Sequence, residues 1–375
     1  MRRMTLNIEQ VFLDMSNEAI SEVSEVSDGR ATAHRRGRMA WQRLAVPVLL
    51  GLLVGAPVIA TAQPALEPLG IAMEGWPYPF PVRFHEFALE GETVRQAYMD
   101  LAPTGPANGR TALLLHGRNF PASYWEGVMR KLAAAGYRVI ATDQIGFGRS
   151  SKPDVHFTFD MYARNTAALL DALGIGEVDV VGHSLGGMLA VRFTRTYPKR
   201  VRKLVLEAPV GLEDYRQTVP AVTDQFLYDR EYALSAAAYR SFLRDTYSLS
   251  LPAEAVEPFV VLRERLKLSG EYPRWVRSFV QTYQMIHDQP VVHEYPLVRT
   301  PTLFIMGAND HNAPGKPYTT PELGAGMGFN ADNARRIAGT MPNAKVIVFE
   351  GVGHMPHMER PAEFGDAMLS FLSRD

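Results

Sequence analysis

The chain contains no cysteine among its 375 residues. This absence excludes disulfide bonds, metal sites built from thiolates, cysteine nucleophiles and anchoring through a lipid on cysteine. Charge of one sign is not in excess either, because the formal net charge at pH 7 is −1. Without surplus lysine and arginine to neutralise phosphates, the composition gives no indication of a nucleic acid or an acidic membrane surface as partner.

Several sequence motifs are missing as well. We find no internal repeat, no coiled-coil heptad and no phosphate-binding loop. The glycines Gly324, Gly326 and Gly328 follow no predicted strand, so they do not indicate nucleotide binding. The pair His354 and His357 lacks the helical spacing of a zinc protease motif. We therefore predict no cofactor and no metal.

Long hydrophobic runs are scarce, and the most apolar stretch lies near the N-terminus. Residues 44–60 are interrupted by two prolines, whereas a membrane-spanning helix needs about 20 apolar residues. This stretch follows an arginine-rich segment and ends at Ala60-Thr61-Ala62, the order found in secretory signal peptides. We predict cleavage near Ala62, no stable membrane span after it, and a periplasmic or secreted protein. The sequence leaves two start sites open, Met1 and Met39.

Beyond this N-terminal extension (1–62), the sequence divides into three parts. Residues 63–81 are rich in proline and glycine and predict an extended lead-in. Residues 82–210 and 298–375 alternate short apolar strands with helices. That alternation specifies an α/β fold with a doubly wound, mostly parallel sheet. Strands are predicted at 82–89, 93–100, 111–117, 138–143, 177–182, 203–208, 302–306 and 345–349, and helices at 124–135, 159–173, 185–197, 331–341 and 361–372.

The segment 211–297 interrupts the alternation. It carries no strand-like run but many aromatic residues, and the spacing of Tyr232, Ala236, Tyr239 and Leu243 is helical. We interpret the segment as several helices that form an inserted cap. Most of its aromatic side chains are expected in the cap's own core, and a minority would line a pocket beneath it.

A candidate reactive group lies within Gly182-x-Ser184-x-Gly186, between a predicted strand and a predicted helix. In that setting a serine sits on a strained turn and projects its hydroxyl outward, while glycines let neighbouring backbone approach. The amides that open the helix face the same point and can receive developing negative charge.

A serine hydroxyl needs a base to take its proton and an acid to orient that base. Asp310 follows the predicted strand 302–306, and His354 follows the strand 345–349. The carboxyl ends of parallel strands meet at one edge of the sheet, where ligands bind in such folds. The sequence therefore places Ser184, Asp310 and His354 at the same edge.

Three further motifs accompany this order of residues: His116-Gly117 after an early strand, a glycine-rich loop from Asp143 to Ser150, and the segment from Gly353 to Pro361. Together they closely resemble the α/β-hydrolase fold superfamily, in its serine esterase/lipase-like branch with a helical cap. The resemblance extends from Val82 to the C-terminus. It implies a small-molecule substrate.

By the same resemblance, Ser184 is the nucleophile, His354 the general base and later acid, and Asp310 the orienting carboxylate. The implied oxyanion hole consists of the backbone N–H groups of Leu185 and Arg118.

The residue at position 184 narrows the expected chemistry. Relatives that hydrolyse epoxides or haloalkanes use aspartate there, so serine favours hydrolysis of a carboxylic ester or related acyl bond of a small, largely apolar substrate. Carbon–carbon bond hydrolysis, acyl transfer to an alcohol and cofactor-free peroxide chemistry are alternatives on the same three residues. Another is a non-catalytic protein that retains a ligand under the cap.

Two features of the sequence, Arg118 and the long connection 311–330, depart from the pattern common in the α/β-hydrolase superfamily. The Arg118 side chain could bind a substrate carboxylate, or it could face solvent or pair with the cap. The long connection 311–330 could line the entrance, contact the cap or form a surface insertion. Other polar residues are expected to support loops: His116, His183, Asp143, His357 and Glu359, with Asp143 also weighed as a replacement for Asp310.

Overall fold

The computed structural model describes residues 66–374. By its contacts the chain divides into two units, Met1–Ala62 and Gln63–Asp375. The predicted signal peptide and its cleavage site lie outside the described residues. Among residues 66–374, no helix is both long enough and apolar enough to cross a membrane.

The second unit is built on one eight-stranded sheet with the order β1-β2-β4-β3-β5-β6-β7-β8. Strands β1 and β2 form an antiparallel hairpin, β2 runs antiparallel to β4, and all other neighbours are parallel. The α/β fold with a mostly parallel sheet is thus confirmed. The strands are β1 (Val82–Leu89), β2 (Glu92–Leu101), β3 (Thr111–Leu115), β4 (Arg138–Thr142), β5 (Val178–His183), β6 (Val201–Glu207), β7 (Thr302–Gly307) and β8 (Ala344–Phe349).

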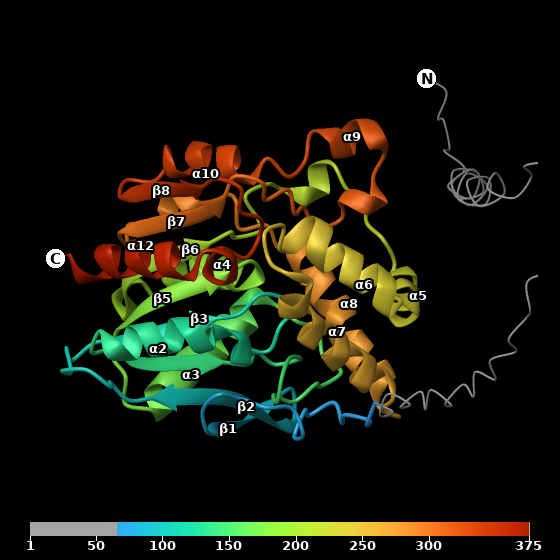
Figure 1. The fold of residues 1–375 in the computed structure, drawn as a ribbon, viewed down its shortest axis with the longest axis horizontal. Helices are drawn as coiled ribbons and strands as arrows, with labels where there is room; N and C mark the ends of the chain where they lie inside the picture. Colours follow the sequence, from blue (N-terminus) through green and yellow to red (C-terminus); the bar gives the residue numbers. More distant parts are fainter. Residues whose placement is uncertain (1–65, 375) are drawn as a thin grey trace, which may run out of the picture. The chain divides into compact units, whose positions relative to one another are not determined.

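Helices cover both faces of the sheet (Figure 1). On one side α2 (Glu126–Ala134) and α12 (Pro361–Ser373) form a buried cluster that includes Ala112 and Leu114 of β3. On the other side α3 (Phe159–Ala172) and α4 (Leu185–Thr196) belong to the same buried cluster as Leu113 and Leu115, and α10 (Asn330–Ala338) packs on β7 and β8. Because successive side chains of a strand point to opposite faces, both faces of β3 are apolar, which explains its unbroken hydrophobic run.

Most predicted boundaries lie within two residues of the observed ones. The largest difference is α10, which ends at Ala338 rather than at residue 341, because Gly339 follows and glycine favours helix ends. The remaining short helices outside the cap are η1 (Ala122–Trp125), η2 (Pro198–Arg200), η6 (Lys316–Tyr318), α9 (Pro321–Ala325) and α11 (Pro356–Glu359).

The segment between β6 and β7 contains helices joined by loops and no strand, as the absence of strand patterns predicted. It lies beside the carboxyl ends of the parallel strands (Figure 1). Its helices are η3 (Tyr215–Gln217), α5 (Asp224–Ala233), α6 (Ala236–Phe242), η4 (Leu243–Tyr247), α7 (Ala253–Lys267), α8 (Tyr272–Asp288) and η5 (Tyr295–Leu297). One helical spacing was misleading: Tyr232 and Tyr239 lie on separate helices, because the Ser235 hydroxyl caps a new N-terminus by accepting from the Ala238 N–H at 3.2 Å.

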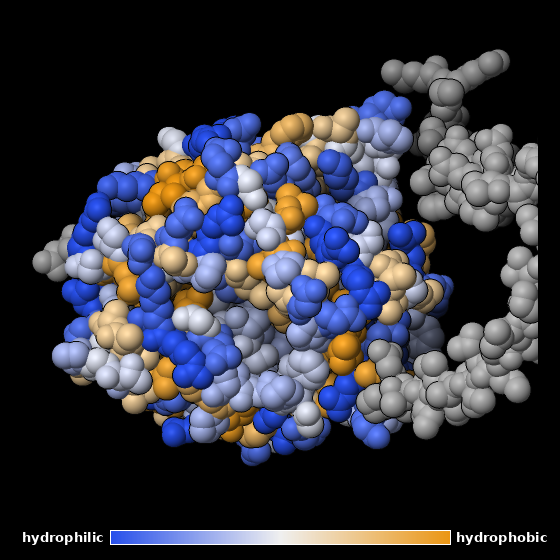
Figure 2. Space-filling model, viewed as in Figure 1, coloured by the Kyte–Doolittle hydropathy of each residue, from blue (hydrophilic) through white to orange (hydrophobic). Residues whose placement is uncertain are grey.

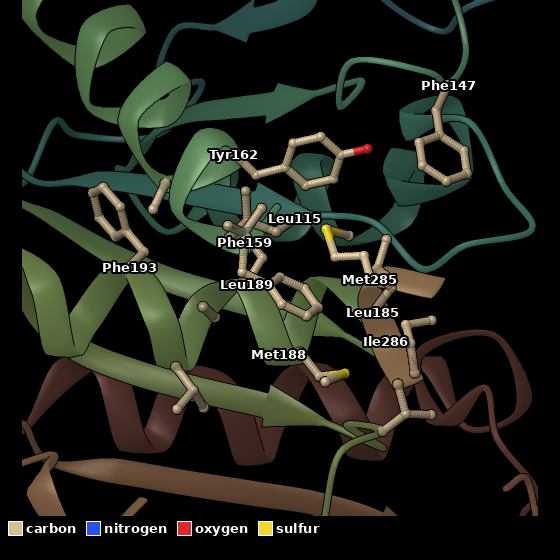
Figure 3. Packing of buried hydrophobic residues seen from close by; sticks show 14 of the residues in the cluster. Leu115, Phe147, Phe159, Tyr162, Leu185, Met188, Leu189, Phe193, Met285 and Ile286 are labelled. Atoms are coloured by element: carbon tan, nitrogen blue, oxygen red, sulfur yellow. The ribbon is translucent and has the colours of Figure 1, made fainter. Parts of the chain in front are cut away.

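The cap is anchored on the helix that begins beside Ser184. Figure 3 shows Met285 and Ile286 of α8 beside Leu185 and Met188 of α4, and all four side chains belong to the same buried cluster. On the face that Figure 2 shows, hydrophobic residues are instead dispersed among hydrophilic ones. The apolar contact between α8 and α4 fixes the cap directly above the carboxyl edge of the sheet.

The lead-in also packs against the cap. The Leu69 N–H donates to the Arg265 carbonyl of α7 at 3.0 Å, and the Arg265 Nε donates to the Glu67 carbonyl at 2.9 Å. Leu69 and Met73 are buried. Residues 66–76 therefore form a strap that contributes to the wall under the cap.

Candidate active site

Ser184 lies on the sharp turn between β5 and α4. Its φ of 55° and ψ of −117° are strained for a residue with a side chain. The turn requires glycine on both sides: a Cβ at Gly186 would lie 2.1 Å from the Leu115 carbonyl oxygen, and one at Gly182 would lie 2.4 Å from the Gly186 carbonyl oxygen. The Gly-x-Ser-x-Gly spacing is thus dictated by close backbone packing around the serine.

The structure brings Ser184, His354 and Asp310 together. The distance from the Ser184 Oγ to the His354 Nε2 is 2.9 Å, and that from the His354 Nδ1 to the Asp310 Oδ2 is 3.0 Å. Since a carboxylate only accepts, Nδ1 carries the hydrogen and Nε2 is free to accept from the serine hydroxyl. All three residues are buried, with exposed fractions of 3%, 0% and 1%.

Two backbone donors face the same region. Leu185 is the first residue of α4, and a Cβ on Gly117, the residue before Arg118, would lie 3.2 Å from the Ser184 Cβ. Within residues 66–374, neither the Leu185 N–H nor the Arg118 N–H donates to a protein acceptor. Unpaired amides beside a buried nucleophile can receive the negative charge of a tetrahedral intermediate.

His183 links the loops on either side of Ser184. Its Nε2 lies 2.8 Å from the His354 carbonyl oxygen, and its Nδ1 lies 2.9 Å from the Tyr124 hydroxyl, which accepts from the Gly117 N–H at 3.0 Å. The carbonyl requires a hydrogen on Nε2, so Nδ1 accepts from Tyr124. Burial, together with His354 and His357, lowers the pKa of His183 well below its ordinary value. The neutral ring therefore supports both loops without exchanging protons at neutral pH.

His116 and Asp143 support the loop opposite the nucleophile. His116 accepts from the Gln144 N–H at 2.9 Å and contacts the Gly117 carbonyl at 2.8 Å, and burial lowers its pKa. The Asp143 carboxylate accepts from the Tyr78 hydroxyl and from two backbone N–H groups, at 2.6, 2.7 and 2.9 Å. Asp310, not Asp143, is the carboxylate that contacts His354.

His357 and Glu359 hold the turn that carries His354. The Glu359 carboxylate accepts from the Gly353 N–H at 2.9 Å and from the Ser250 hydroxyl of the cap at 2.8 Å. His357 donates from its backbone and from Nδ1 to the buried Glu207 carboxylate, at 2.6 and 2.8 Å. The supporting roles expected from the sequence agree with these contacts.

Asn312 is a site residue that sequence reasoning missed. Its backbone N–H donates to the Asp310 Oδ1 at 3.0 Å, and its Nδ2 lies 3.3 Å from the His354 Nε2. The Asn330 side chain in turn donates to the Asn312 carbonyl at 2.9 Å. The sequence signal for Asn312 was its position two residues after Asp310. That signal was weak, because Asn312 lies at the start of a segment without a regular pattern.

The connection 311–330 contacts the cap. The Thr319 hydroxyl donates to the Thr218 carbonyl at 2.5 Å, and the Tyr318 ring packs against Tyr283 of α8 with centroids 5.5 Å apart. Of the interpretations that the sequence left open, contact with the cap is the one that the structure supports.

The Arg118 side chain also reaches the cap. Its Nε donates to the Thr282 Oγ1 at 3.1 Å, its Nη2 donates to the Phe279 carbonyl at 2.8 Å, and the guanidinium lies 4.5 Å from the centre of the Phe279 ring. The side chain is half-buried, and its partners are uncharged. Arg118 is therefore paired with α8 but keeps an uncompensated positive charge.

A pocket opens beside the Arg118–Asn119 loop and beneath α7 and α8. Its enclosed volume is about 20 Å³, and the space reaches about 360 Å³ only when the open solvent at its mouth is included. Among residues 66–374, its charged lining residues are Arg118 and Arg263; the others are Met73, Asn119, Phe120, Pro121, Phe147, Gly148, Tyr239, Phe259, Leu262, Leu266, Trp275 and Phe279. The Arg263 Nη2 pairs with the Glu231 carboxylate, but its buried Nε has no partner among the described residues. The pocket thus combines apolar walls with an excess of positive charge.

The part of the chain that the structure describes contains no group of three or more histidine, cysteine, aspartate or glutamate residues arranged to hold a metal ion.

The sequence pattern that defines the Alpha/beta hydrolase family matches residues 112–367. The chain belongs to this family. A probable hydrolytic enzyme from Pseudomonas aeruginosa has a similar crystal structure, with a TM-score of 0.80, 38% identity and coverage of 82% of this chain and 99% of that one. This hydrolase therefore has a relative whose fold matches over nearly the whole length of that relative.

Two relatives of this chain are named for substrates of the same chemical class. The chain is 30% identical over 299 residues to a 2-hydroxy-6-oxononadienedioate/2-hydroxy-6-oxononatrienedioate hydrolase from Burkholderia vietnamiensis, covering 76% of this chain and 93% of the relative. It is 29% identical over 288 residues to a 2-hydroxy-6-oxo-2,4-heptadienoate hydrolase from Pseudomonas putida, covering 71% and 90%. Both relatives are named for substrates that carry a ketone and at least one carboxylate.

Proposed function

We propose that this protein is a serine hydrolase that cleaves a carbon–carbon bond next to a ketone in a small, unsaturated keto acid. The observation that carries the proposal is the buried chain of contacts from Ser184 through His354 to Asp310. A pocket at the neighbouring Arg118–Asn119 loop supports it, because its charged lining residues within the described part of the chain are both arginines. Its named relatives act on keto acids that contain no ester or amide, so hydrolysis of those compounds must break a carbon–carbon bond.

The proposed reaction begins when the Ser184 Oγ attacks the ketone carbon and the His354 Nε2 takes the hydroxyl proton. The carbonyl electron pair moves to oxygen, where the N–H groups of Leu185 and Arg118 stabilise the oxyanion. On collapse of this intermediate, the carbon–carbon bond breaks. This step requires that the 2-hydroxyl proton has first moved to the carbon beside the ketone, which leaves the acid as its 2-oxo-3-ene tautomer. The electron pair of the broken bond is then delocalised as an enolate, which takes the proton from His354.

The second half restores the enzyme. His354 takes a proton from water, the hydroxide attacks the acyl group on Ser184, and the returned proton releases the serine with a second carboxylic acid. Asp310 holds the imidazole in the required tautomer throughout and stabilises its charged form.

The pocket supports an acidic substrate. Arg118 has only uncharged partners, and Arg263 keeps an unpaired Nε although Glu231 neutralises its charge. A guanidinium N–H in a dehydrated, aromatic-walled space forms strong hydrogen bonds to a carboxylate. The aromatic and aliphatic walls suit an unsaturated carbon chain.

Carboxylic ester hydrolysis is the second candidate, because the same residues attack an ester carbonyl and the pocket walls are mostly apolar. The ester activity expected from the sequence and the carbon–carbon alternative thus differ in the leaving group. The relatives favour the alternative.

Wild-type protein assayed on two substrates distinguishes them. We expect kcat/KM for a 2-hydroxy-6-oxo-dienoate, followed by the loss of its conjugated absorbance, to exceed that for a 4-nitrophenyl ester of similar length by tenfold or more, on the order of the 1–3 kcal/mol that pocket contacts supply. Turnover of the ester alone would establish the second candidate. Folded protein that hydrolyses neither and resists a fluorophosphonate probe would indicate a non-catalytic binding protein.

The Arg118 side chain provides a test of substrate charge. In Arg118→Ala, which retains the backbone N–H, we expect KM for an ester with a terminal carboxylate to rise about tenfold, the value of one charge-assisted hydrogen bond. KM for the matched ester with a terminal methyl group should change little. Equal increases for the two esters would show that Arg118 only joins the loop to α8.

We further propose that the protein is exported, on the basis of the signal-like residues 1–62. N-terminal sequencing of protein from the periplasm and the medium, with Gln63 as the expected first residue, tests this proposal.

A further inference from the structure

Tyr247 of the cap lies against the residues to which the proposed function assigns the chemistry. It is the last residue of η4, a π-helical turn in which the Ser248 N–H donates to the Leu243 carbonyl five residues earlier, at 2.8 Å. Such turns are rare, and they occur frequently at functional sites. Tyr247 is buried.

The backbone and ring of Tyr247 hold His354 from the cap side. The His354 N–H donates to the Tyr247 carbonyl at 2.7 Å, and the two ring centres lie 4.5 Å apart with an interplanar angle of 63°. Close contact continues at Gly353, where a Cβ would lie 2.7 Å from the Tyr247 carbonyl oxygen. The position of Tyr247 is therefore fixed independently of its hydroxyl.

The hydroxyl of Tyr247 contacts the loop that carries one of the two proposed oxyanion donors. It accepts from the Asn119 Nδ2 at 2.9 Å. Asn119 is the neighbour of Arg118, one of the two proposed oxyanion donors. Because Asn119 occupies one lone pair of the phenol oxygen, the hydroxyl hydrogen remains available for donation.

The protonation state of the Tyr247 phenol allows it to donate a hydrogen bond. Burial raises the pKa of Tyr247 to about 12, although the Arg118 charge and the hydrogen bond from Asn119 act in the opposite direction. The phenol therefore keeps its hydrogen throughout the neutral pH range. The nearby guanidinium polarises it and strengthens its hydrogen bonds.

We propose that Tyr247 is a catalytic residue whose hydroxyl donates a third hydrogen bond to the oxyanion, beside the N–H groups of Leu185 and Arg118. Asn119 orients this hydroxyl. The inference rests on the proposed function, because it assigns Tyr247 a role in the attack by Ser184. It also gives the cap a part in the chemistry, since the oxyanion hole is complete only when η4 is docked.

The test compares rates of Ser184 modification by a fluorophosphonate, whose phosphoryl oxygen occupies the oxyanion site, with hydrolysis of 4-nitrophenyl and phenyl butyrate. Tyr247→Phe retains the ring and the backbone contacts and loses only the hydroxyl. We expect the labelling rate constant and both kcat values to fall about 100-fold, the effect of one lost oxyanion donor, while KM and Tm change little.

Asn119→Ala should reduce the same rates by a smaller factor in the wild-type background and have no further effect in Tyr247→Phe, because both substitutions act through one hydroxyl. Tyr295→Phe is the matched control: its hydroxyl is buried and has no partner within residues 66–374. We expect it to leave every rate unchanged.

Unchanged rates in Tyr247→Phe would overturn the inference and leave the proposed function intact. A loss that is much larger for phenyl butyrate than for 4-nitrophenyl butyrate would also overturn it, because that pattern indicates proton donation to the leaving group. Absence of labelling in the wild-type protein would instead overturn the proposed function, and this inference with it.

Discussion

Ser184→Ala is expected to lower kcat by about 10⁴ to 10⁶-fold, the range that removal of an activated serine nucleophile produces. The Ser184 Oγ is the oxygen that contacts the His354 Nε2, at 2.9 Å. Alanine leaves His354 in place but removes the atom that forms the acyl-enzyme. Steady-state turnover of a keto acid and of a 4-nitrophenyl ester measures the loss.

The substitution should leave the fold intact. Alanine adopts the strained turn as poorly as serine does, so the Tm is expected to stay within a few degrees of the wild-type value. Ser278→Ala is the matched control, because Ser278 is a buried serine of α8 whose hydroxyl has no partner in the described part of the chain. It should retain activity and fluorophosphonate labelling. Labelling of Ser184→Ala would mean that another residue is the nucleophile.

Much of the fold follows from patterns that act locally. Each parallel strand is buried on both faces and is therefore a short, continuous apolar run, which is recognisable without knowledge of its neighbours. The turn at Ser184 was recognisable for a similar reason: the close approach of Leu115 and Gly186 backbone atoms leaves glycine as the only residue that fits at positions 186 and 182. Once the strand order is assigned, Asp310 and His354 fall at the same edge of the sheet.

The contacts that complete the site depend on side-chain directions that sequence periodicity does not encode. Tyr247 is one of many cap aromatics, and only the π-helical turn rotates it toward His354, more than 100 positions away along the chain. The Arg118 side chain could have faced solvent, substrate or cap, and its direction is set by Thr282 and Phe279 of α8. The separation of α5 from α6 similarly depended on one serine cap.

Asp310→Asn is expected to lower kcat by about 10⁴-fold, with KM nearly unchanged. The Asp310 Oδ2 accepts the hydrogen of the His354 Nδ1 at 3.0 Å and so keeps Nε2 free to accept from Ser184. An asparagine amide can donate to Nδ1 instead, which moves the ring hydrogen to Nε2. In that tautomer the imidazole cannot take the serine proton.

Asp143→Asn is the informative comparison, because Asp143 is the other carboxylate that the sequence offered for the same role. Its oxygens accept from the Tyr78 hydroxyl, the Ala122 N–H and the Arg149 N–H. An asparagine can accept only part of these bonds, so we expect the free energy of unfolding to fall by about 1–3 kcal/mol while kcat of the folded protein stays within tenfold of wild type. Chemical denaturation and steady-state kinetics should therefore distinguish the two variants. Asp310→Asn is expected to lose catalysis, and Asp143→Asn is expected to lose stability. The reverse pattern would assign the orienting carboxylate to Asp143, because only the residue that fixes the His354 tautomer can affect kcat by several orders of magnitude without unfolding the chain.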